Sequence, residues 1–183
     1  MTTKTGTTGR HIMDGAGIDL ALSRIAAEII ENLGMAEDFG IIGIRRRGVH
    51  LARRLCGKIE AIRSRPVLNG ILDITLYRDD LTTLGDRPTL RETLIDFDIN
   101  TRSLVLVDDV LYTGRTIRSA LDGLVDLGRP RRVQLAVLID RGHRELPIQA
   151  DYVGKCVQTA DDEVVEVLLK EEDGEERVAV NKF

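Results

Sequence analysis

The sequence predicts an α/β fold built on a mainly parallel sheet with flanking helices. Continuous apolar runs at residues 104–107 and 133–139 are typical of strands buried on both faces of such a sheet. Residues 116–127, between the two runs, carry apolar side chains at helical spacing and end before Gly128 and Pro130. Strand, helix and strand therefore form a βαβ unit, which indicates a parallel pair of strands.

The chain begins with a segment rich in Thr and Gly, and we expect residues 1–13 to be flexible. A single domain then occupies residues 14–183, an ordinary length for one hydrophobic core. Its first helix is expected at residues 15–33, where apolar residues recur at helical spacing between a cap at Asp14 and a stop at Gly34.

The other strands, helices and loops are predicted from changes in the spacing of apolar residues and from turn-forming residues. Residues 39–44 predict a short buried strand, and an arginine-rich turn at 45–48 leads into a helix that Pro66 ends. Polar residues 81–93 form a loop long enough to be an active-site lid. Residues 173–174, Asp and Gly, indicate a hairpin turn. The remaining strands of the sheet are expected at residues 67–76, 151–157, 164–169 and 177–180.

Composition places the chain among ordinary globular proteins, with 43% hydrophobic and 31% charged residues. No apolar run approaches the roughly eighteen residues of a membrane span, and the N-terminus lacks the apolar core of a secretion signal. The two distant cysteines, Cys56 and Cys156, fit idle thiols better than a disulfide or a metal site. Together these features predict a cytoplasmic protein without a membrane partner.

The net charge of −4 hides an uneven distribution along the chain. Residues 151–183 carry 10 acidic and 4 basic side chains, whereas residues 45–65 carry eight basic side chains against one acidic residue, Glu60. The basic segment could attract phosphate, pyrophosphate or RNA, and a solvated helix face is the alternative.

Two adjacent carboxylates, Asp108 and Asp109, follow the first apolar run directly. After them, Thr113, Gly114 and Thr116 offer hydroxyls, close backbone approach and the free N–H groups of a helix start, which together bind a phosphate dianion. The chain has neither a G-x-G-x-x-G fingerprint nor Gly-Lys followed by Ser or Thr, which excludes dinucleotide-binding and P-loop sites. Metal ligation or helix capping is the alternative for the acidic pair, but the adjacent turn favours a sugar-phosphate site.

The segment LVLVDDVLYTGRT at residues 104–116 resembles the phosphoribosyl pyrophosphate (PRPP) motif of type I phosphoribosyltransferases. In that family the acidic pair holds the ribose hydroxyls and the following loop holds the 5′-phosphate. Three more segments resemble, in order and spacing, the pyrimidine operon regulators that double as uracil phosphoribosyltransferases. These segments are GIRRRG at 43–48, ITLYRDD at 74–80 and DRGHRELP at 140–147.

The resemblance extends over about residues 14–180 and implies the type I phosphoribosyltransferase fold, with a small hood from segments near 66–98 and the C-terminus. It implies a reaction of PRPP with uracil that gives UMP and pyrophosphate, with Mg²⁺ carried by PRPP and no direct protein ligand to the metal. Such transfer has oxocarbenium character, so the protein positions the reactants and excludes water rather than supplying a nucleophile. A homodimer or a larger homo-oligomer is also implied.

The resemblance assigns roles to individual residues. The expected catalytic residues are Asp108, Asp109 and Arg78. The expected PRPP and UMP contacts are Val107, Asp108, Asp109, Val110, Leu111, Tyr112, Thr113, Gly114, Arg115 and Thr116. The expected pyrophosphate contacts are Ile44, Arg45, Arg46, Arg47, Gly48, Tyr77 and Arg78. The expected uracil contacts are Leu138, Ile139, Asp140 and Arg141.

A second role is implied as well, in which UMP strengthens binding to the leader RNA of pyrimidine genes and transcription is attenuated. The expected RNA contacts are Ser23, Arg24, Arg141 and Arg144. Where RNA-binding members carry His in the first helix this chain has Ala27, and where they carry Arg after the Leu-Pro-Ile turn it has Gln149. A salvage enzyme without an RNA role is therefore the alternative. Transfer to another base is a third hypothesis, because the phosphate half of the site does not read the base.

Overall fold

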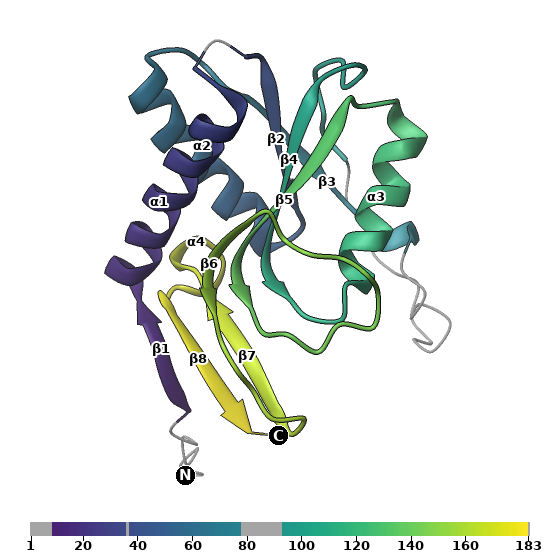
Figure 1. Cartoon of the computed structure of the whole chain (residues 1–183). Coiled ribbons are helices and arrows are strands. Elements are labelled where there is room, and N and C mark those ends of the chain that lie inside the picture. Colours follow the sequence, from purple (N-terminus) through teal and green to yellow (C-terminus); the bar gives the residue numbers. More distant parts are fainter. Residues whose placement is uncertain (1–8, 36, 78–92, 183) are drawn as a thin grey trace.

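The computed structural model describes residues 9–35, 37–77 and 93–182, whose arrangement Figure 1 shows. The strands are β1 (Arg10–Asp14), β2 (Phe39–Ile44), β3 (Leu68–Leu72), β4 (Ser103–Leu111), β5 (Arg132–Asp140), β6 (Tyr152–Cys156), β7 (Glu163–Leu168) and β8 (Arg177–Lys182). The helices are α1 (Gly15–Leu33), α2 (Arg47–Arg63), α3 (Arg115–Leu127) and α4 (Lys170–Asp173), with a short 3-10 turn, η1 (Thr75–Tyr77).

Five strands form a parallel sheet in the order β3-β2-β4-β5-β6. Helices α1 and α2 cover one face of this sheet and α3 covers the other, so this part has three layers (Figure 1). Along β4, Val105 and Val107 pack with the α1 and α2 side, whereas Leu104 and Leu106 pack with α3. Both faces of β4 are thus buried, which explains its unbroken apolar run and confirms the predicted parallel α/β fold.

A second sheet, which we call the hood, has three antiparallel strands in the order β1-β8-β7. Its first strand pairs Arg10 with Val180 and Asp14 with Arg177, so residues 10–13 form part of a strand, contrary to the expected flexible segment. The expectation that all C-terminal strands finish one sheet is also wrong. β7 and β8 pair within the hood, and only β6 joins the parallel sheet.

The connections around β3 and β7 differ from the predicted ones. β3 ends at Leu72, earlier than expected, because the Asp73 carboxylate accepts a hydrogen bond from the Thr75 N–H at 2.9 Å and starts η1. β3 also lies at the edge of the parallel sheet and not in the hood. Between β7 and β8, the predicted hairpin turn is replaced by α4, which ends at Gly174 with a φ of 74°. The lid expected at 81–93 falls almost wholly outside the described residues.

The helix ends agree with the sequence signals. The Asp14 carboxylate accepts a hydrogen bond from the Gly17 N–H at 2.8 Å and caps α1, and Gly34 ends that helix with a φ of 86°. α2 ends at Arg63, where Ser64 takes the left-handed conformation before Pro66. The local predictions for both helices are therefore confirmed.

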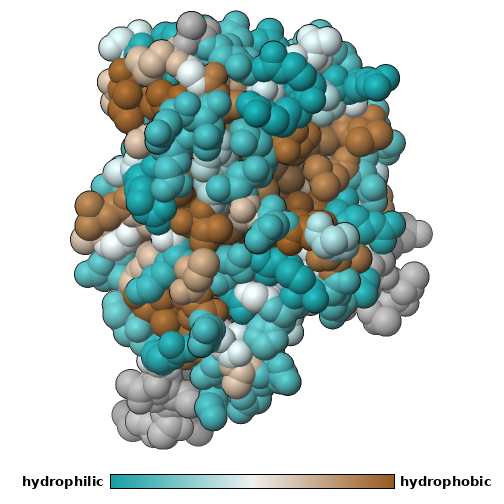
Figure 2. Space-filling model, in the orientation of Figure 1, coloured by the Kyte–Doolittle hydropathy of each residue, from teal (hydrophilic) through white to brown (hydrophobic). Residues whose placement is uncertain are grey.

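The surface in Figure 2 is mostly hydrophilic with separate apolar patches, one of them over α3. Exposed apolar side chains on that helix include Val125 and Leu127. Both cysteines are free, with Cys56 buried and Cys156 exposed. Across the described part of the chain, the helices are too short or too polar to cross a membrane.

Candidate active site

The acidic pair lies inside the carboxyl-terminal end of β4. Asp108 is buried, with 6% of its surface exposed, and Asp109 is half-buried. The Asp108 Oδ1 atom accepts a hydrogen bond from the Asp109 N–H at 2.9 Å, and Asp109 Oδ1 accepts one from the Val110 N–H at 2.9 Å. The backbone of β4 thereby orients both carboxylates at the carboxyl-terminal end of the sheet.

Burial raises the pKa of both carboxyl groups. It holds the pKa of Asp108 well above the usual range, and the negative charge of Asp109 adds to this effect. The pKa of Asp109 is also raised by burial, although its hydrogen bond with Asp108 and the charge of Arg47 oppose the rise. Two adjacent carboxyl groups, one buried and one half-buried, favour a ligand that brings hydroxyl donors or a cation, because either relieves their repulsion.

The turn after β4, residues 113–116, is here called the phosphate turn. It enters α3 at Gly114, whose φ of 93° costs a glycine little. Because α3 starts at Arg115, the N–H groups of its first turn lack partners within the helix. The Thr113 carbonyl oxygen accepts hydrogen bonds from the N–H groups of Glu145 and Leu146, which fix the turn against the loop after β5. The phosphate turn thus has the backbone geometry of an anion-binding helix start.

Arg45, Arg46 and Arg47, here called the arginine loop, connect β2 to α2. A Cβ atom at Gly43 would lie 2.6 Å from the Gly48 carbonyl oxygen, and a Cβ atom at Gly48 would lie 2.4 Å from the carbonyl oxygen of Val107. Neither position has room for a side chain. The two glycines therefore let the arginine loop rest directly on the end of β4.

A cavity of about 360 Å³ forms where the arginine loop meets the acidic pair. Its lining residues are Arg45, Arg46, Arg47, Ile74, Asp108, Asp109, Val110 and Thr116. β2 and β4 are parallel neighbours, so their carboxyl-terminal ends lie side by side at the same end of the sheet, although the two strands are far apart in sequence. The cavity therefore combines a cationic wall, an acidic wall and a helix start, as a ribose phosphate with a second phosphate group requires.

The segment expected to contact uracil lies at the end of β5, the next strand along from β4. The Asp140 carboxylate accepts a hydrogen bond from the Gly142 N–H at 2.9 Å, and the Arg141 N–H donates to the Leu111 carbonyl oxygen at 3.1 Å. These bonds place the segment beside the phosphate turn. Five residues predicted as ligand contacts have buried apolar side chains and do not line the cavity. They are Ile44, Val107, Leu111, Leu138 and Ile139.

Tyr77, a predicted pyrophosphate contact, does not line the cavity. Tyr77 lies against α3, where its hydroxyl donates to Asp126 at 2.8 Å and its carbonyl oxygen accepts a hydrogen bond from the Ser119 hydroxyl at 3.0 Å. The ring of Tyr77 is therefore committed to helix packing. Arg78 lies outside the described residues, and its catalytic role stays a prediction.

Comparison with known proteins agrees with this geometry. The sequence profile of the phosphoribosyl transferase domain matches residues 11–172. The protein named bifunctional protein PyrR from Pelotomaculum thermopropionicum is 60% identical over 170 residues, which cover 93% of this chain and 94% of the relative. The protein of that name from Thermus aquaticus is 56% identical over 168 residues, covering 92% and 93%. The chain belongs to the PyrR family of phosphoribosyltransferases.

Solved structures support the fold of this phosphoribosyltransferase. A hypoxanthine-guanine phosphoribosyltransferase from Bacillus anthracis superposes with a TM-score of 0.70 at 17% identity, covering 92% of this chain and 95% of that one. The hypoxanthine phosphoribosyltransferase of Trypanosoma cruzi gives a TM-score of 0.72 at 19% identity, covering 94% and 95%. At such identities the likeness concerns the fold alone, and the predicted type I phosphoribosyltransferase fold is confirmed.

In this phosphoribosyltransferase, Arg141 is folded inward. Only 6% of its surface is exposed, and its guanidinium lies 4.1 Å from the centre of the Tyr112 ring. Its side chain also donates to the Thr159 hydroxyl at 3.2 Å and to the Glu163 carbonyl oxygen at 2.8 Å. This burial argues against the predicted direct RNA contact. The Arg141 side chain instead packs on the residue that precedes the phosphate turn.

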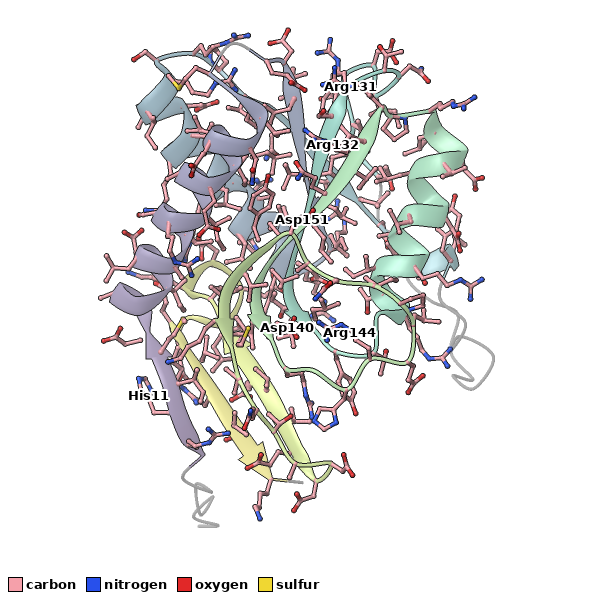
Figure 3. The ribbon with its side chains drawn as sticks, viewed as in Figure 1. His11, Arg131, Arg132, Asp140, Arg144 and Asp151 are labelled. Carbon is pink, nitrogen blue, oxygen red and sulfur yellow. The ribbon has the colours of Figure 1, made fainter. Side chains whose placement is uncertain are left out.

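Arg144 is engaged in a similar way. Its guanidinium donates to the carbonyl oxygens of Tyr112 and Ile148, each at 3.0 Å, and to the Asp140 carboxylate at 2.5 Å. Figure 3 shows Asp140 and Arg144 side by side at the carboxyl-terminal end of the parallel sheet. Because these bonds use all three guanidinium nitrogens, Arg144 stabilises its own loop, and its predicted RNA contact is not supported by this geometry.

The other two predicted RNA contacts lie on α1. Arg24 pairs with Glu28 and donates to the carbonyl oxygens of Val153 and Gly154 in β6, while about half of its side chain remains exposed. Ser23 accepts a hydrogen bond from the Lys58 ammonium group at 2.9 Å. RNA contact by Ser23 and Arg24 stays a prediction.

The donor set at the cavity suits a magnesium ion that is carried by a substrate. Within residues 9–35, 37–77 and 93–182, no group of three or more His, Cys, Asp or Glu side chains is placed to hold a metal. Mg²⁺ seldom needs such a cage, since it keeps several waters and binds through one or two carboxylates together with substrate phosphates. Asp108 and Asp109, at the cavity wall, fit this pattern.

Two residues at the site were not predicted from the sequence to have these contacts. Ile74 lines the cavity from the segment after β3. Asp173 forms two hydrogen bonds with Arg47, although its sequence had suggested only a turn. A signal for this second contact was present, because residues 171–176 are strongly acidic and the start of α2 is strongly basic.

Proposed function

We propose that this protein transfers the phosphoribosyl group of PRPP to uracil and releases UMP and pyrophosphate. The observation that carries the proposal is the cavity in which the arginine loop faces the acidic pair. PRPP presents the same pattern, with two hydroxyls, a 5′-phosphate and a pyrophosphate on one ribose. The cavity volume of about 360 Å³ also lies in the range of small-molecule sites.

Each wall of the cavity has a distinct task in this proposal. Asp108 and Asp109 accept hydrogen bonds from the ribose hydroxyls, and the phosphate turn binds the 5′-phosphate through its N–H groups. The arginine loop binds the pyrophosphate and stabilises the charge that develops as it leaves. Mg²⁺, when bound with PRPP, neutralises part of the charge on the pyrophosphate oxygens. The main chain of residues 138–141 reads the carbonyl and N–H groups of uracil.

The direct test is product formation from defined substrates. Purified protein is incubated with PRPP, Mg²⁺ and labelled uracil, and in parallel with labelled hypoxanthine or orotate. UMP formation with uracil, and little product with the other bases, is the expected result. Product from hypoxanthine or orotate but not from uracil would support phosphoribosyl transfer as the reaction and would refute uracil as the substrate.

The second proposed role is UMP-dependent binding to the leader RNA of pyrimidine genes. Two observations favour it. Similar proteins carry the name bifunctional protein PyrR. The phosphate turn is also hydrogen-bonded to Glu145 and Leu146 of the surface loop after β5, so nucleotide occupancy at the turn can change that loop. Such coupling requires different affinities of RNA for the two protein states.

The RNA proposal is tested by filter binding against the organism's own pyrimidine leader transcripts. We expect UMP to increase retention, and we expect retention to fall steeply with salt because phosphate contacts release counterions. The Arg24→Ala variant should bind RNA less well and still make UMP. If the parent retains no RNA at low salt with saturating UMP, the salvage enzyme without a regulatory role is the correct description.

We also propose that the protein acts in the cytoplasm as a homodimer or larger homo-oligomer. The apolar patch over α3, which includes Val125 and Leu127, offers a surface for association (Figure 2). Sedimentation of the purified protein tests this directly, and a purely monomeric species at micromolar concentration would contradict it.

A further inference from the structure

Helix α4, which connects β7 to β8 of the hood, contacts the arginine loop through a bidentate pair of Asp173 with Arg47 and a longer pair of Glu172 with Arg46 at 3.5 Å. The Arg47 Nε atom donates to Asp173 Oδ2 at 3.0 Å, and Arg47 Nη2 donates to Asp173 Oδ1 at 2.7 Å. Both side chains are largely shielded, with 32% and 16% of their surfaces exposed. Paired hydrogen bonds of this kind fix the plane and direction of a guanidinium group, which a single bond would not do.

Arg47 connects α4 with the cavity that the arginine loop and the acidic pair form. Its backbone begins α2, the residue lines the cavity, and its charge acts on the carboxyl group of Asp109. The ion pair uses the Nε and Nη2 atoms, so an anion in the cavity would meet the guanidinium at its remaining Nη1 edge. The orientation that Asp173 imposes thus determines what Arg47 presents to a ligand.

Asp173 is itself held in place. Its Oδ2 atom accepts a hydrogen bond from the Leu169 N–H at 2.9 Å, and its own N–H donates to the Leu169 carbonyl oxygen at 2.8 Å. The carboxylate is therefore fixed to the single turn of α4 before it meets Arg47. Arg47 also lowers the pKa of this carboxyl group, which keeps it charged.

Arg54, further along α2, pairs with the same acidic segment but does not line the cavity. The Arg54 guanidinium donates to Glu171 at 2.9 and 2.6 Å, and Arg54 also pairs with Glu176. This second bidentate pair lies about two helical turns along α2 from Arg47. It resembles the first pair in chemistry and differs in its distance from the arginine loop, so it provides a matched control.

We propose that Asp173 is a positioning residue for pyrophosphate, which acts by holding the Arg47 guanidinium in the orientation that binds this group. The inference rests on the proposed function, since it assumes that pyrophosphate occupies the cavity. A pre-oriented arginine binds more tightly because its rotamer freedom is lost on folding and not on ligand binding. UMP has no pyrophosphate, so its affinity should not depend on this pair.

Calorimetry of the full-length protein with magnesium pyrophosphate and, separately, with UMP tests the proposal. Asp173→Asn should weaken pyrophosphate binding roughly tenfold, a loss typical of partners that orient ligand-binding side chains, and should leave UMP binding within about twofold. Glu171→Gln should leave both affinities within about twofold. Asp173→Glu, which keeps the charge, should recover part of the pyrophosphate affinity. Thermal unfolding of each variant identifies any that fail to fold.

Equal losses for Asp173→Asn and Glu171→Gln, or an equal loss of pyrophosphate and UMP affinity in Asp173→Asn, would reduce Asp173 to a structural role and overturn the proposal. A parent protein that does not bind magnesium pyrophosphate would overturn it too. A parent that binds pyrophosphate with the expected variant pattern but makes no UMP would refute only the proposed reaction. The measurement therefore separates the two failures.

Discussion

The carbonyl oxygen of Val107 occupies the space where a side chain at Gly48 would begin, since a Cβ atom there would lie 2.4 Å from it. This contact joins the start of α2 to the end of β4. It brings the arginine loop within reach of Asp108 and Asp109, which form the opposite wall of the cavity. Close packing of two backbone segments, and not only the binding of a ligand, thus requires glycine at this position.

Gly48→Ala should therefore destabilise the protein and displace the arginine loop. We expect the free energy of unfolding to fall by about 1 to 3 kcal/mol, as for other overpacked sites, with weaker pyrophosphate binding. Gly57→Ala in the same helix is the control, because no atom lies within 4 Å of its Cβ position. That variant should gain roughly 0.5 to 1 kcal/mol from helix propensity. Urea unfolding of both variants measures the contrast, and similar stability would contradict the close packing.

Asp109→Asn should retain the fold and lose most of the activity. The amide oxygen can still accept the hydrogen bond from the Val110 N–H, so the strand end should be preserved. We expect UMP synthesis to fall on the order of a hundredfold or more, because a charged group aimed at the reacting ribose is removed. Asp122→Asn, on the exposed side of α3, serves as the control. Activity within about twofold of the parent would remove Asp109 from the catalytic group.

Asp108→Asn should change how stability depends on pH. Burial raises the pKa of Asp108 above 3.8, so the folded state binds this proton more tightly than the unfolded state does. The parent should therefore lose stability as the pH rises from the unfolded pKa through the raised folded pKa. Asparagine cannot ionise, and it keeps an acceptor for the Asp109 N–H. We expect the variant to exceed the parent in unfolding free energy at neutral pH, with the difference shrinking in acid. If the parent instead gains stability relative to the variant as the pH rises, the raised pKa of Asp108 is refuted.

Arg141→Ala should impair folding stability and catalysis together. The variant loses the contact with the Tyr112 ring and two hydrogen bonds, which we estimate at about 2 to 4 kcal/mol. Because Tyr112 adjoins the phosphate turn, UMP binding should weaken as well. Arg118→Ala, which breaks an exposed pair with Asp122, should change stability by less than about 0.5 kcal/mol. If the variant loses only RNA binding and keeps its stability and UMP binding, the result would support a direct contact between Arg141 and RNA.

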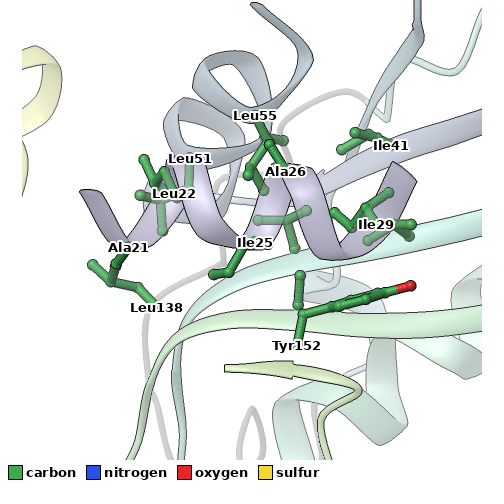
Figure 4. Packing of buried hydrophobic residues seen from close by; sticks show 14 of the residues in the cluster. Ala21, Leu22, Ile25, Ala26, Ile29, Ile41, Leu51, Leu55, Leu138 and Tyr152 are labelled. Atoms are coloured by element: carbon green, nitrogen blue, oxygen red, sulfur yellow. The ribbon is translucent and has the colours of Figure 1, made fainter. Parts of the chain in front are cut away.

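Local sequence determined the elements and the chemistry of the central site. The apolar spacing of α1 predicted the buried face that Figure 4 shows, with Leu22 beside Leu51 of α2 and with Ile25 and Ile29 in the same buried cluster. The Asp14 cap and the run of β4 into Asp108 and Asp109 were also predicted, because each depends on neighbours within a few residues. Periodicity, capping and turn chemistry act over such short distances, so they can be inferred from sequence alone.

Contacts between distant segments were decided by the tertiary structure. Residues 10–14 have no strand pattern of their own and become a strand because β8 offers an unpaired edge. Arg141 was predicted to contact uracil and RNA, yet residues 159 and 163 supply the acceptors that hold its side chain inside the protein. Asp173 reaches Arg47 because α4, between β7 and β8, lies against the start of α2. In each case the residue or strand that decides the contact lies far away in the sequence. Charge and hydropathy can indicate that such a partner exists, but only the packing of the folded chain selects which residue it is.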